Sequence, residues 1–111
     1  MILKTGDSMK VIWSEFASGS LADIYRYHKL IVSENVARKI RSKIFSTTEQ
    51  LSKHPHSGQI ENTLAELKEG HRYLVEGNYK IIYKEVSEGI LITDIFDTRQ
   101  DPIKINEPNR K

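Results

Sequence analysis

The sequence has no cysteine and no long hydrophobic run, and each absence excludes a class of protein. Without a thiol there can be no disulfide bond, thiolate metal site or cysteine nucleophile, which is typical of proteins in the reducing cytoplasm. No apolar run exceeds three residues, whereas a membrane-spanning helix needs about 20, and the first residues lack the hydrophobic region of a signal peptide. We therefore expect a cytoplasmic protein that has no membrane partner.

Length and composition indicate one folded domain. The chain has 111 residues, of which 38% are hydrophobic and 29% are charged, the balance of a globular protein with one hydrophobic core. The formal net charge is only +2, so charge alone does not identify a partner. A mid-chain basic cluster is typical of a solvated helix face, although it would also suit RNA or an acidic partner segment. It consists of Arg38, Lys39, Arg41 and Lys43.

Two amphipathic helices are predicted in the first half of the chain. Ser14 is a suitable N-cap for a helix with apolar residues at every third or fourth position, which ends near Val32. Ser33 can cap a second helix, which the segment 54–58 (HPHSG) ends because proline cannot continue it and glycine permits a turn. Since the join between them is very short, the two helices should form an antiparallel hairpin.

Four strands complete the predicted fold. They are 9–13 (MKVIW) and three runs rich in tyrosine and β-branched residues, at 71–76, 79–86 and 90–97, with glycine-bearing turns between them. The last three should form an antiparallel meander, and residues 59–70 should cross over to it as a loop with a helical turn at about 64–67. We predict an α+β fold in the order β-α-α-β-β-β, with the helix hairpin on one face of a small, mainly antiparallel sheet.

The strand alternation assigns side chains to the two faces of this sheet. Tyr79, Ile81 and Tyr83 share one face and Lys80, Ile82 and Lys84 the other, so basic groups should lie opposite the helices. The expected domain spans residues 9–103. A flexible tail, 1–8, precedes it, with Met9 as an alternative start, and a polar tail, 104–111, that is disordered in isolation follows it.

Four motifs together resemble a known family. They are MKVIWS at 9–14, HPHSG at 54–58, HRYLVEGNYKIIYK at 71–84 and DTRQDP at 97–102, and LADIYRY at 21–27 fits the same pattern. In order and spacing the chain, from Met9 to Ile103, is similar to the RelE/ParE superfamily of toxins from type II toxin–antitoxin systems. The resemblance implies a growth-inhibiting, plasmid-stabilising or stress-response toxin that needs no metal or cofactor. It also implies a cognate antitoxin, one helix of which binds a hydrophobic groove of the toxin.

The superfamily contains two mechanisms, and the resemblance favours one of them. ParE-like toxins inhibit DNA gyrase, whereas RelE-like toxins cut messenger RNA on the ribosome without a metal. The opening strand, the HPHSG turn and the GNYKIIYK hairpin of this chain look closer to the ParE branch. A RelE-like endoribonuclease remains the alternative, and an inactive relative that only binds antitoxin is a third hypothesis.

The nuclease alternative requires specific residues. Cleavage needs a base for the 2′-hydroxyl, cations for the phosphate and an acid for the leaving group. By resemblance, Lys80 stands where RelE-like toxins have a sheet arginine and Arg99 matches the arginine after the last strand, with His71 or Arg72 in support. A lysine pair of that branch is replaced by His71 and Tyr73, and its C-terminal tyrosine or histidine has no match after Arg99.

Each of these residues also has a purely structural interpretation. Lys80, like its neighbour Lys84, suits a solvated sheet face, and Arg99 could be held in an ion pair by Asp97 or Asp101. Tyr79 and Tyr83 are expected in the core rather than on RNA, and His28 at the edge of the core. The spacing of the histidines gives no metal site.

Overall fold

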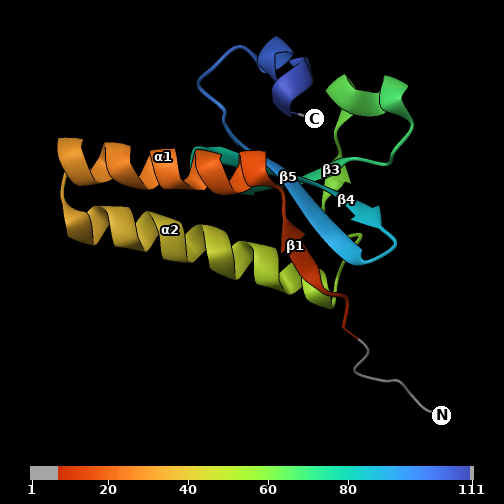
Figure 1. Cartoon of the computed structure of the whole chain (residues 1–111), viewed down its shortest axis with the longest axis horizontal. Helices are drawn as coiled ribbons and strands as arrows, with labels where there is room; N and C mark the ends of the chain where they lie inside the picture. The colour runs from red at the N-terminus through yellow and green to blue at the C-terminus, as the bar shows by residue number, and fades with distance from the viewer. Residues whose placement is uncertain (1–7, 111) are drawn as a thin grey trace.

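The computed structural model describes residues 8–110 as a helix hairpin packed on a five-stranded sheet (Figure 1). The helices are α1 (Glu15–Ile31) and α2 (Glu34–Glu49), and the strands are β1 (Val11–Trp13), β2 (Gln59–Ile60), β3 (Arg72–Glu76), β4 (Tyr79–Val86) and β5 (Gly89–Asp97). Short 3-10 helices are η1 (Gln50–Ser52), η2 (Asn62–Leu67), η3 (Pro102–Asn106) and η4 (Pro108–Arg110). The predicted α+β class is confirmed. Most of the predicted tail 1–8 lies outside the described residues.

Side-chain caps start both long helices, as the sequence predicts. The Ser14 hydroxyl accepts a hydrogen bond from the Ala17 amide at 3.0 Å, and the Ser33 hydroxyl accepts one from the Val36 amide at 3.1 Å. Each bond satisfies an amide that the first turn of a helix leaves unpaired. The helices therefore begin next to their predicted caps, and the join between them forces the antiparallel hairpin seen in Figure 1. No described helix is both long and apolar enough to span a membrane.

The strands follow the order β1-β5-β4-β3-β2. β1 pairs in parallel with β5, and every other pairing is antiparallel. The predicted bounds of the middle strand, 79–86, are those of β4. The prediction missed β2, which replaces part of the expected loop, because two residues show no periodicity.

Gly58, in the turn before β2, has a different role from the one expected. Its backbone is not in the left-handed region. An added Cβ would instead lie 2.5 Å from the Tyr83 hydroxyl and 2.7 Å from the Tyr73 carbonyl oxygen. The turn thus needs glycine because β3 and β4 approach it closely.

The main core lies between the hairpin and the sheet. Ala17, Leu21 and Ile44 of the helices meet Tyr79, Tyr83 and other residues of β4 and β5 there. Tyr79 and Tyr83 are 6% and 1% exposed, which confirms their predicted place in the core. His28 contacts this core from α1, with Nε2 3.0 Å from the Tyr79 hydroxyl.

A second, smaller core covers the other face of the sheet. Leu64 of η2 and Ile105 of η3 pack there on Ile82 and Phe96. Residues 104–111 were expected to be a polar tail that is disordered in isolation; the described part of it, to Arg110, is folded over this face in η3 and η4. Its one deeply buried apolar side chain, Ile105, is 1% exposed, and a single such residue leaves no periodic signal in a sequence.

Candidate functional site

Lys80 of β4 lies on the sheet face opposite the hairpin and is paired with a buried carboxylate. Its ammonium donates to Glu61 Oε1 at 2.8 Å and lies 4.1 Å from the centre of the Tyr73 ring. Glu61 is 2% exposed and also accepts hydrogen bonds from Thr63. Burial acts to raise the pKa of Glu61, but the hydrogen bonds from Lys80 and Thr63 outweigh it and hold the pKa below its usual value. The Glu61 carboxyl therefore stays ionised at neutral pH.

His71, just before β3, is enclosed on the same face of the sheet. Its side chain is 0% exposed, and neither ring nitrogen has a hydrogen-bond partner. Burial lowers the pKa of His71, and the nearby Lys84 lowers it further, against a smaller opposing effect of Glu69 and Glu61. The imidazole is therefore neutral near pH 7 and out of contact with solvent, so a substrate hydroxyl cannot reach it in this conformation.

Arg72 points to the opposite face of the sheet from His71 and Lys80, because neighbouring residues of a strand alternate. Its guanidinium donates to the Gly58 carbonyl oxygen at 2.8 Å, while the Gly58 amide donates to the Tyr83 hydroxyl at 2.9 Å. Both bonds hold the 54–58 turn against β3 and β4. The contacts of Arg72 are thus those of a structural residue.

Arg99 follows β5 and is exposed, yet two nitrogens of its guanidinium donate hydrogen bonds to one carboxylate, that of Asp97. Nε donates to Asp97 Oδ1 at 2.9 Å and Nη2 to Asp97 Oδ2 at 2.7 Å. The hydrogen bond from Arg99 holds the pKa of Asp97 below its usual value, although partial burial opposes it. The ion pair considered for Arg99 from the sequence is present, with Asp97 as partner. Arg99 also lines a cleft of about 460 Å³ beside α1, with Tyr27 and Tyr79.

The structure does not bring the four candidate residues to one point. His71 and Lys80 share a face of the sheet, Arg72 lies on the other face, and Arg99 lies beyond the end of β5. Lys84, taken from the sequence as a solvated lysine, is paired with Glu69 at 2.7 Å. Within residues 8–110, no group of three or more histidine and carboxylate side chains could hold a metal ion.

Two charged contacts on this face were not predicted. One is the buried Glu61 that holds Lys80. The other joins Arg110 of η4 to Asp94 of β5, at 3.0 and 3.1 Å, with the guanidinium 5.0 Å from the ring centres of Phe16 and Phe96. Burial raises the pKa of Asp94 despite the opposing effect of Arg110. In the sequence Glu61 and Arg110 stand in ordinary polar segments and Asp94 interrupts the apolar run 90–97, so nothing local marks them as partners.

A solved structure shares the fold of this chain. Among solved structures the chain is similar to one from a chromosomal ParDE TA system of P. aeruginosa, with a TM-score of 0.68. The sequences are 18% identical, and the match covers 82% of this chain and 97% of that chain. A likeness at this level of identity shows the fold alone. A comparison with curated proteins found no match.

The sequence itself identifies the family. Residues 11–102 match the family model of the ParE toxin of the type II toxin–antitoxin system parDE. Because this match spans most of the chain, the protein belongs to the ParE toxin family. It is the toxin component of a type II module, and such a module supplies a cognate antitoxin as its partner. The predicted superfamily and its ParE-like branch are confirmed, and the RelE-like alternative receives no support.

Proposed function

We propose that this toxin inhibits growth from the cytoplasm by binding DNA gyrase, and that its antitoxin neutralises it. The observation that carries the proposal is the state of the four residues on which an RNA-cleaving alternative would depend. Lys80 and Arg99 are each paired with a carboxylate, Arg72 holds a backbone carbonyl oxygen, and His71 is enclosed. A toxin with this arrangement is better suited to binding a large target than to metal-free phosphate chemistry.

The contacts of Lys80 argue most directly against RNA cleavage. To stabilise a phosphate, its ammonium would have to leave Glu61, which is 2% exposed. A buried carboxylate that loses its partner is strongly destabilised, so this exchange would oppose substrate binding. His71 could not compensate as a base, because it would first have to become exposed to reach a 2′-hydroxyl.

The test is induction of the toxin in bacteria, with DNA synthesis, protein synthesis and message integrity followed over the first minutes. A gyrase-directed toxin should stop DNA synthesis first while messages stay intact. The purified toxin should also inhibit supercoiling by purified gyrase, and the antitoxin encoded beside it should reverse the effect.

Two other outcomes would contradict the proposal. An early stop of translation with cut messages, abolished by Arg99→Ala, would identify a nuclease, and Arg99 is exposed enough for this change to leave the fold intact. Absence of any growth defect, with antitoxin binding retained, would identify an inactive relative.

A further inference from the structure

The end of the helix hairpin projects beyond the sheet that the hairpin covers (Figure 1). The last buried residue of α1 is Leu21 and the first of α2 is Ala37. Between them, residues 22–36 include no buried side chain. The core therefore does not determine which residues stand at this end of the hairpin.

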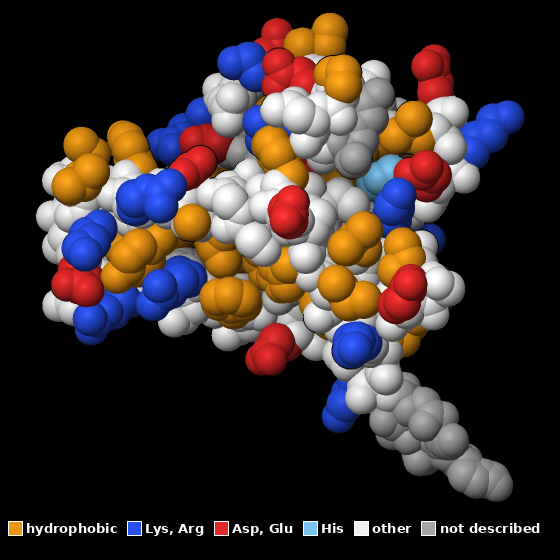
Figure 2. All heavy atoms as spheres, viewed as in Figure 1, with side chains coloured by type: hydrophobic (Ala, Val, Ile, Leu, Met, Phe, Trp, Pro, Cys, Tyr) orange, Lys and Arg blue, Asp and Glu red, His pale blue; other side chains and the backbone are white. Residues whose placement is uncertain are grey.

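Four large apolar side chains are exposed at the projecting end. Tyr27 is 55%, Leu30 83%, Ile31 65% and Val32 59% exposed, and together we call them the tip patch. The first three are spaced i, i+3 and i+4, so they lie on one side of the last turns of α1. Figure 2 shows hydrophobic side chains gathered at this end of the hairpin, with lysine and arginine side chains beside them. One exposed apolar residue is ordinary, but a group of four marks an interaction surface.

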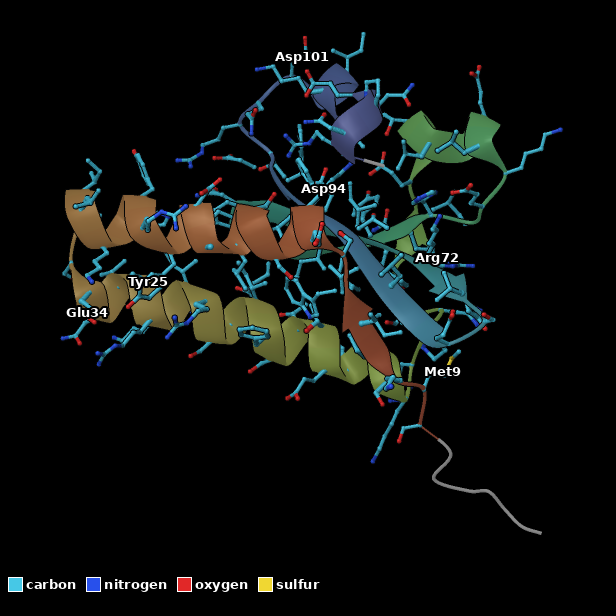
Figure 3. The ribbon with its side chains drawn as sticks, in the orientation of Figure 1. Met9, Tyr25, Glu34, Arg72, Asp94 and Asp101 are labelled. Atoms are coloured by element: carbon cyan, nitrogen blue, oxygen red, sulfur yellow. The ribbon has the colours of Figure 1, made fainter. Side chains whose placement is uncertain are left out.

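The hairpin holds the tip patch in a fixed shape. The Glu34 carboxylate accepts hydrogen bonds from the Tyr25 hydroxyl at 3.3 Å and from the Arg38 guanidinium at 2.9 Å. Figure 3 shows Tyr25 and Glu34 close together at this end of the two helices. The Ser33 amide also donates to the His28 carbonyl oxygen at 3.0 Å. A surface that is ordered before binding loses little conformational entropy when a partner covers it.

The charges around the tip patch are mostly positive. Residues 26–39 include four lysine or arginine residues and one carboxylate. Both arginines are paired, one with Asp23 and the other with Glu34. No carboxylate in the described part of the chain is paired with Lys29 or Lys39. The tip thus combines a large apolar patch with two cations that the chain itself does not neutralise.

We propose that the tip patch is the surface through which the toxin contacts DNA gyrase, and that it inserts into an apolar recess of the enzyme with an acidic rim. The proposal rests on gyrase as the target, as proposed above, and adds the surface of the toxin that binds it. Tyrosine and aliphatic side chains form the dry centre of protein interfaces. The two free lysines would steer the toxin toward an acidic rim and fix its orientation there.

The balance of apolar area and charge argues against other occupants. Proteins that bind DNA tightly make about six to ten phosphate contacts, whereas only two cations are free here. Recognition of an anionic membrane takes clusters of about four to eight basic residues. A second copy of the chain would bring the same unpaired lysines, so the like charges would repel. A protein recess with an acidic rim uses both the apolar patch and the two lysines.

Leu30→Gln and Ile31→Gln test the tip patch, and Ile103→Gln is the matched control. Glutamine is polar and a good helix former, and Ile103 is 72% exposed in η3, on another part of the molecule. Each tip variant should raise the toxin concentration that half-inhibits supercoiling by purified gyrase about tenfold or more, as the loss of one buried aliphatic side chain implies. The control should change it by less than about threefold. Circular dichroism and thermal unfolding check that each variant is folded.

Charge reversal tests the acidic rim. Lys29→Glu combined with Lys39→Glu should slow association with immobilised gyrase about tenfold and reduce its dependence on salt. Lys104→Glu, at an exposed lysine of η3, should have a much smaller effect. Association that is unchanged or faster in the double variant would show that the recess has no acidic rim.

The outcomes separate this proposal from the choice of target. If wild-type toxin inhibits gyrase and Leu30→Gln and Ile31→Gln inhibit it equally well, the tip proposal is overturned while the target stands. If wild-type toxin does not inhibit gyrase, both proposals are wrong. If the tip variants inhibit gyrase normally but lose binding to the antitoxin, to DNA or to vesicles of anionic phospholipid, the tip patch serves that partner and the proposal is equally overturned.

Discussion

Arg110 and Asp94 form an ion pair near the end of the chain, and Arg110→Ala tests how far this pair holds the last residues in place. The side chains are 15% and 1% exposed, and two hydrogen bonds join them. Removing one partner of such a pair leaves a buried charge, at a cost of about 3–5 kcal/mol. Because η4 has only three residues and none of them is buried, this short helix can move aside and admit water. We therefore expect the free energy of unfolding to fall by about 3 kcal/mol, which is the lower end of this range.

Urea unfolding followed by the fluorescence of Trp13 measures this change. Arg99→Ala is the matched control: it also removes an arginine that makes two hydrogen bonds to an aspartate of β5, but the side chains of Arg99 and Asp97 are 60% and 25% exposed. It should cost much less, because water screens exposed pairs. Asp94→Asn combined with Arg110→Ala should recover part of the loss, since no buried charge then remains. If Arg110→Ala is no more destabilising than Arg99→Ala, the pair does not hold the C-terminal segment.

Two further predictions concern the sheet and its turn. In Gly58→Ala the new Cβ would lie 2.5 Å from the Tyr83 hydroxyl, so we expect a loss of about 1–3 kcal/mol in thermal unfolding. Gly19→Ala, with nothing within 4 Å of the added Cβ, should instead stabilise α1 by about 0.5–1 kcal/mol, and equal effects would refute the steric argument. Because burial lowers the pKa of His71, the unfolded chain binds this proton more readily than the folded chain. Stability should therefore be complete above about pH 6.5 and fall below it, by at most about 1.4 kcal/mol per pH unit. His71→Leu should remove this part of the slope in urea titrations at pH 7.5 and 5.5, and an unchanged slope would show that His71 is not its source.

The parts of the fold that were predicted are those that depend on neighbouring residues. Ser14 and Ser33 cap the helices that follow them within one turn. β4 keeps its predicted bounds because alternating apolar residues and glycine turns define them locally. The prediction that Tyr79 and Tyr83 lie in the core followed from the same alternation.

The parts that were missed depend on residues far apart in the chain. Lys80 is held by Glu61, 19 residues earlier, and Arg110 reaches Asp94 across 16 residues. Neither carboxylate belongs to a motif, and the segments 59–70 and 102–110 show no clear period. The sequence therefore predicted a basic face exposed to solvent. In the structure these two segments cover much of this face, and its lysines form ion pairs with Glu61 and Glu69.

The contrast between the two basic surfaces decides what kind of site this toxin can present. On the sheet face, Lys80 and Lys84 meet carboxylates from the crossover between β2 and β3, so those charges are already satisfied within the chain. On the hairpin, the Arg41 guanidinium lies over the Tyr25 ring and is paired with no carboxylate among residues 8–110. It also lines an open groove that is mostly apolar. Burial of such a surface gains hydrophobic free energy and satisfies charge at the same time, provided that the partner is apolar and acidic. Lys80 and Lys84 thus stabilise the fold through carboxylates of the same chain, whereas Arg41 has no carboxylate partner among residues 8–110, so a change at Arg41 should disturb the fold less than a change at Lys80.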